Sequence, residues 1–109
     1  MANTFKLKTK ANVGVTTVGI YTAPAATTTV VIGITMANTS GSGVNVGVGI
    51  TRAGTTEDVK LLKNAPIPQG SSHESMAGNK IVLEATDTVT VDSDTNNSID
   101  AALTIMEIT

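Results

Sequence analysis

The chain has 109 residues, the size of one ordinary domain, and a formal net charge of −2 at pH 7. It contains no cysteine, which excludes a disulfide scaffold, a thiolate metal site and a cysteine nucleophile. The negative balance argues against non-specific nucleic-acid binding, and one Phe and one Tyr are too few for an aromatic platform that stacks bases or sugars. Thr, Val and Ile are abundant, and their branched side chains favour strands over helices.

The first half of the chain alternates apolar and polar residues with a period of two, which is typical of strands. The alternation predicts strands over residues 5–10, 13–21, 28–38 and 44–52. The 28–38 segment is the longest, and with Val30, Ile32 and Ile34 on one face it is expected to be central.

In the 44–52 segment, Val44 to Ile50 alternate with two glycines that point outward, Gly47 and Gly49. Outward glycines weaken a strand unless another backbone or another subunit packs close to them.

The second half predicts shorter strands over residues 58–62, 71–76, 80–84 and 88–92, and a long last strand over 99–108. Residues 63–70 contain two prolines and a glycine and are expected to form an extended connection. The last strand places Ala101, Leu103, Ile105 and Glu107 on one face.

Eight or nine short strands at this spacing predict an all-β fold, a single-domain antiparallel sandwich of two sheets with Greek-key or jelly-roll-like connections. The expected division of the chain is a basic N-terminal arm or edge strand over residues 1–12 and the sandwich domain over 13–109.

Positive charge is concentrated at the start of the chain. Lys6, Lys8 and Lys10 are the only charged residues before residue 52, and they alternate with Phe5 and Leu7. Two interpretations stay open: an anchor that docks on an acidic surface, or solvated lysines on an exposed strand.

The long strands are apolar on both faces, so some apolar side chains are expected on the outer surface of the molecule. Candidates for an oligomer interface are Ile32, Ile34, Met106 and Ile108. The alternative is that these strands are simply central.

No catalytic constellation is predicted. His73 is the only histidine, and its neighbours Ser72 and Glu74 would point to the opposite face of a strand, so a hydrolase triad is excluded and an exposed loop histidine is expected. One histidine cannot build a zinc site, and the glycines lack the spacing of a nucleotide cradle. We therefore expect that the chain binds no cofactor and is not an enzyme.

The loop after residue 91 is a weak calcium candidate. Asp92, Asp94 and Asn96 match the first oxygen-donor positions of a calcium loop, with Asp100 nearby. The glycine and the final glutamate of such loops are missing, so a polar turn is the default interpretation.

Several segments resemble one protein family. The 20–25 segment, Ile-Tyr-Thr-Ala-Pro-Ala, the Pro-rich crossover and Gly-Ser turn of 61–72, and the strands at 80–87 and 103–107 resemble small β-sandwich virion structural proteins of tailed bacteriophages, cyanophages in particular. The resemblance spans roughly residues 17–109 and implies a capsid decoration (cement) protein or a tail accessory.

The resemblance implies a non-enzymatic subunit that stabilises the shell by binding across joints between major capsid proteins. The expected contact is Phe5, Lys6, Leu7, Lys8 and Lys10, and changing the three lysines together to Glu should abolish loading without unfolding the domain. The alternative is a tail, neck or fibre accessory that binds a host receptor. A homo-oligomer is expected, a trimer by the symmetry of a shell.

No apolar run approaches the about 18 residues of a membrane span, and the first ten residues lack the apolar stretch of a secretory signal. We therefore expect a soluble protein without membrane or nucleic-acid partners, made in the host cytoplasm and incorporated into the virion.

Overall fold

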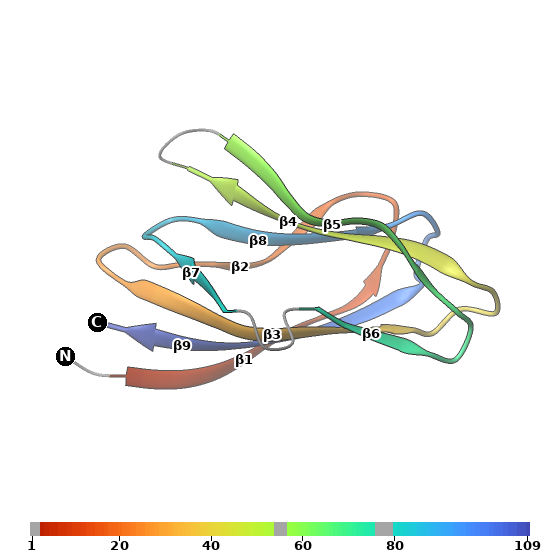
Figure 1. Ribbon diagram of the computed structural model, residues 1–109, viewed down its shortest axis with the longest axis horizontal. Coiled ribbons are helices and arrows are strands. Elements are labelled where there is room, and N and C mark those ends of the chain that lie inside the picture. The colour runs from red at the N-terminus through yellow and green to blue at the C-terminus, as the bar shows by residue number, and fades with distance from the viewer. Residues whose placement is uncertain (1–2, 54–56, 76–79) are drawn as a thin grey trace.

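The computed structural model describes residues 3–53, 57–75 and 80–109, and these form nine strands and no helix (Figure 1). The strands are β1 (Asn3–Val13), β2 (Val18–Thr22), β3 (Thr28–Asn38), β4 (Val44–Arg52), β5 (Glu57–Ile67), β6 (Ser72–Ser75), β7 (Ile81–Leu83), β8 (Thr88–Ser93) and β9 (Ile99–Ile108).

The strands form two antiparallel sheets that pack face to face, which confirms the predicted sandwich. The first sheet has the order β1-β9-β3-β6, with β7 also paired to β3, and the second has the order β2-β8-β4-β5. Most consecutive strands lie in different sheets, so most connections cross from one sheet to the other (Figure 1). The two ends of the described chain lie together, because Asn3 pairs with Ile108.

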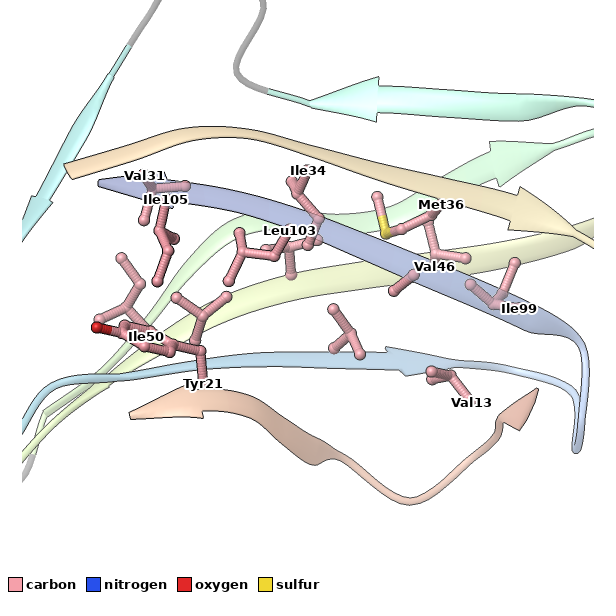
Figure 2. Close-up of a cluster of buried hydrophobic side chains, with 14 of the residues drawn as sticks. Val13, Tyr21, Val31, Ile34, Met36, Val46, Ile50, Ile99, Leu103 and Ile105 are labelled. Carbon is pink, nitrogen blue, oxygen red and sulfur yellow. The ribbon is translucent and has the colours of Figure 1, made fainter. Parts of the chain in front are cut away.

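The core lies between the sheets and is built from the inward half of each alternating strand (Figure 2). In β9, Ala101, Leu103 and Ile105 are buried and Glu107 lies on the same inward face, as the alternation predicted. Truncating a fully buried side chain such as Leu103 costs about 2–5 kcal/mol in protein cores.

Two predicted segments are organised differently in the structure, beyond shifts of strand ends. Residues 13–21 do not form one strand: β1 ends at Val13 and β2 begins at Val18, because the chain crosses there from the first sheet to the second. The expected connection over 63–70 is wrong as well, since β5 continues to Ile67. Pro66 is tolerated because β5 is an edge strand: among the described strands it pairs with β4 alone.

A bulge in β3 changes which residues face inward. The pairing of β3 with β9 shifts register between Val31 and Gly33, so Val31 and Ile34 both enter the core. Ile34 is only 1% exposed and offers no surface to a partner, which removes it from the interface candidates.

His73 also differs from expectation. It lies on β6 opposite Met36 and is half-buried, so it is a strand residue and not an exposed loop histidine. Met76, at the end of the predicted 71–76 strand, lies outside the described residues. Within the described ranges there is no helix of the length and apolar character needed to cross a membrane.

Candidate functional site

The most distinctive surface is the side of the first sheet that faces away from the core, which we call the outer face. The strand register places Phe5, Met106, Val30 and Val82 in one row across β1, β9, β3 and β7. Phe5 and Val82 are 68% and 60% exposed, so this row is an apolar ridge open to solvent.

The rows beside the ridge carry small or uncharged side chains. Leu7 lies opposite Thr104, and Thr9 lies opposite Ala102, which pairs in turn with Thr35. Leu7 is 64% exposed. Ile32, Met106 and Ile108 are half-buried on strands of this sheet, so these three interface candidates remain available to a partner.

A shallow hollow of about 370 Å³ lies on the outer face beyond these rows. Most of its lining residues have small side chains, and two are charged: the lining comprises Thr9, Ala11, Thr35, Ala37, Ala101 and Ala102, together with Lys10 and Asp100. Asp100 closes the hollow, but its Oδ1 accepts a hydrogen bond of 3.0 Å from the backbone N–H of Asn12, which ties the carboxylate to the β1 backbone.

The outer face carries little charge. Among the described outward residues of these rows, the charged side chains are Asp100 and Glu74, which pairs with Thr35 at the hollow end. A contiguous apolar face that is exposed to solvent is typical of an interaction surface.

The lysines of β1 lie on the other side of the sheet. Lys6 pairs with Ile105 and Lys8 with Leu103, both of which point into the sandwich. Because β1 is an edge strand, its inward side looks onto the open flank between the sheets, where a long side chain reaches solvent along apolar surface. The three lysines therefore line a basic edge, while Phe5 and Leu7 belong to the outer face.

At this edge, Lys6 is engaged within the chain. Its Nζ lies 2.9 Å from Oε1 of Glu107, whose side chain is 8% exposed. The hydroxyl of Tyr21 donates a 2.6 Å hydrogen bond to Oε2 of the same carboxylate and lies 2.8 Å from Oγ1 of Thr29. The cluster joins β2 of one sheet to β1, β3 and β9 of the other.

The environment of this cluster shifts two pKa values. Hydrogen bonds from Tyr21 and Lys6 hold the pKa of the Glu107 carboxyl below its ordinary value of 4.5. Burial, reinforced by the bond to Glu107, raises the pKa of Tyr21 to about 12. Lys8 Nζ lies 6.0 Å from the centre of the Tyr21 ring, so a second cation faces the cluster.

Sequence reasoning missed this cluster. The one available signal was a carboxylate, Glu107, at an inward position of an otherwise apolar strand, since such a group requires a partner.

A second hollow, of about 360 Å³, opens between β7 and the β4–β5 edge. Arg52 is a charged residue of its lining, and the Nη2 of Arg52 lies 2.5 Å from Glu84 Oε1. The Nε of Arg52 lies 3.1 Å from Asp87 Oδ2, an ion pair whose geometry does not make a hydrogen bond. Two carboxylates of the chain itself already neutralise this guanidinium.

The side chains of the candidate calcium loop make hydrogen bonds to other segments of the chain. Asp92 Oδ2 accepts from the Thr17 hydroxyl at 3.0 Å, and Asp94 Oδ1 accepts from the Asn45 N–H at 3.1 Å. Asn96 Oδ1 lies 3.4 Å from the Val15 N–H. Within the described ranges, no three His, Cys, Asp or Glu side chains are grouped to hold a metal.

Comparison with known proteins places the fold. No family model matches the chain, and no curated protein sequence matches it. Among solved structures, it is similar to the subunit of Bacillus endospore appendages, described as disulfide-linked pili, at 15% identity and a TM-score of 0.56, covering 99% of this chain and 87% of that one.

Two viral structures are also similar. A chain of the infectious bursal disease virus Gx strain matches at 12% identity and a TM-score of 0.57, covering 95% of this chain and 33% of that one. A chain of the cyanophage Pam1 capsid asymmetric unit matches at 13% identity and a TM-score of 0.53, covering 96% and 84%. At these identities the likeness shows a shared fold.

Proposed function

We propose that the chain is a non-enzymatic structural subunit of a phage particle, a capsid decoration (cement) protein. The observation that carries this proposal is the outer face, an apolar and nearly uncharged surface with Phe5, Leu7 and Val82 exposed. Leaving such side chains in water is unfavourable by roughly 25 cal/mol per Å² of apolar surface, so assembly that covers them is favoured.

Two further observations support the proposal. The solved structures that share this fold include a chain of a cyanophage capsid and a pilus subunit, both of which are parts of large assemblies. The segments at 20–25 and 61–72 resemble virion proteins of tailed phages. A subunit that binds only the assembled shell stabilises that state by mass action.

The proposed contact with the particle is β1, the edge strand of the first sheet. Lys8 and Lys10 lie along the basic edge and are suited to an acidic surface of the major capsid protein. Lys6 has a different part: its ammonium neutralises the buried Glu107. Changing all three lysines to Glu would therefore disturb the fold as well as the contact.

A sharper experiment leaves Lys6 in place. Particles purified from producing cells are stripped of this chain and reloaded with wild-type protein, with Lys8→Gln/Lys10→Glu, or with the control Lys60→Gln/Lys63→Glu on β5 of the other sheet. Occupancy is measured by sedimentation of the particles and quantification of the bound chain at low and high salt.

We expect the β1 variant to load several-fold less than wild type at low salt, with the difference shrinking at high salt because exposed charges are screened. The control should load normally. Equal loading of both variants would contradict the basic-edge contact, and binding to isolated tails instead of shells would contradict the decoration role in favour of a tail accessory.

A further inference from the structure

We infer that the outer face binds a second copy of this chain, in a twofold dimer in which the ridge of each copy fills the hollow of the other. The inference goes beyond the proposed function because it concerns how two copies of the chain associate in the absence of the particle. The observation behind it is that one face carries both a projection and a matching depression, displaced from each other along the strands.

The register gives the geometry of the match. The ridge at Phe5 and the hollow at Thr9 lie two residues on either side of Leu7 on β1, and on β9 Met106 and Ala102 lie on either side of Thr104. A twofold axis across the strands at the Leu7–Thr104 row reverses the strand direction and keeps each strand opposite its own counterpart. It therefore places Phe5 of one copy over the hollow of the other, as an isologous contact requires.

The volumes agree with this arrangement. An apolar cavity of about 150 Å³ holds a benzene ring. The hollow of about 370 Å³ thus has room for the Phe5 ring and part of a neighbouring side chain. The floor of small side chains, Ala102 and Ala37 among them, lets the second sheet approach to the usual spacing of about 10 Å.

Charge and area favour a second copy over a charged partner. The charged residues at the hollow are Lys10 and Asp100, which have opposite signs, and Asp100 is tied to the Asn12 N–H. With Glu74 they lie away from the twofold axis, so two copies meet without bringing like charges into the centre. Three long strands about 4.8 Å apart that overlap over about nine residues, with the short β6 and β7 beside β3, give a footprint of about 550 Å² per copy. The two copies together then bury about 1,100 Å², close to the lower end of about 1,200 Å² for stable complexes.

In the dimer, the two sides of β1 make different contacts. Phe5 and Leu7 are covered by the second copy, and the basic edge of Lys8 and Lys10 stays open to the particle. The twofold dimer is an alternative to the trimer expected from shell symmetry, and it is favoured here because the ridge and hollow of one face are self-complementary.

The first test is the oligomeric state in sedimentation velocity. Wild-type protein should sediment as a dimer of twice 11.1 kDa. Ala102→Phe, which fills the hollow from outside the core, should weaken the dimer by about 10- to 100-fold, the effect of overpacking a closed contact. Val15→Asp, an exposed apolar residue outside the sheets, is the matched control and should dimerise normally.

A second test does not depend on tolerance of the bulky side chain. Because the chain has no cysteine, single substitutions can be cross-linked cleanly with a short bis-maleimide. Leu7→Cys on the axis should cross-link with itself. Phe5→Cys and Thr9→Cys should each fail alone and cross-link when mixed.

Monomeric wild-type protein at high micromolar concentration, a trimer, or an Ala102→Phe protein that dimerises like wild type would overturn the dimer. So would cross-linking of Phe5→Cys with itself in place of the mixed pair. The particle-loading result is independent of the oligomeric state. A monomer that still loads on shells would contradict this inference and leave the proposed function intact. A dimer that never loads would support this inference and contradict the proposed function.

Discussion

Glu107 shows how one polar residue can fix the relation between two sheets. It is 6% exposed in a strand whose other inward residues are apolar, and it is satisfied by Lys6 from β1 and Tyr21 from β2. An unpaired buried carboxylate is costly, so the favourable arrangement requires both sheets in register. The cluster thereby specifies how the basic edge is held against the sandwich.

The cluster predicts a direct titration. Tyr21 is the only tyrosine, so its ionisation can be followed by tyrosinate absorbance. We expect the native protein to titrate with a pKa of about 12, well above the ordinary 10, because burial and Glu107 disfavour the phenolate. Unfolded protein is the control and should titrate near 10.

The same shifts set the pH range of stability. Because the folded pKa of Tyr21 is raised, its contribution is complete below pH 10 and is lost as pH rises towards 12. Because the folded pKa of Glu107 is lowered, its contribution is present above about pH 4.5 and is lost as pH falls through the folded value. A native Tyr21 that ionises near 10 would contradict the buried cluster.

At the scale of elements, β4 shows why glycines occur in a central strand. Gly47 and Gly49 face away from the core, and both are buried by neighbouring strands. A Cβ at Gly49 would lie 3.0 Å from the carbonyl oxygen of Val59 and 3.1 Å from Thr90 Oγ1. The close backbone anticipated from the sequence is that of β5, within the same chain.

This geometry predicts opposite outcomes for two glycines. Gly49→Ala should destabilise the domain by about 1–3 kcal/mol, because the new methyl group would crowd the Val59 carbonyl oxygen and Thr90 and force β5 or β8 to shift. Gly33→Ala meets nothing within 4 Å and should stabilise by about 0.4–1 kcal/mol through the unfolded chain. Urea denaturation midpoints measure both, and shifts in the same direction would show that the packing around β4 is different.

The alternation of β4 and β9 was enough to predict their inward faces, because both strands are regular and lie inside a sheet. The bulge at Ile32 was not predictable, since a register shift depends on the partner strand and reverses which residues face the core. Which side of β1 faces inward was also not predictable, because an edge strand tolerates lysines on its inward side.

For the whole molecule, the sequence predicted a two-sheet sandwich and an apolar exterior, but not where that exterior lies. Phe5 and Val82 are 77 positions apart in the sequence and share one row only because β1, β9, β3 and β7 are neighbours. The ridge and the hollow are properties of this strand order. No local pattern contains them, which explains why the hollow was not foreseen.

The central claim is that this chain is a subunit of a shell, and it is tested most directly by cryo-electron microscopy of particles with and without the chain. The account predicts difference density of a small β-sandwich at the joints between major capsid proteins, with the basic edge of β1 towards the shell. Particles purified from producing cells that lack the chain, while it stays dispersed in the lysate, would contradict the account.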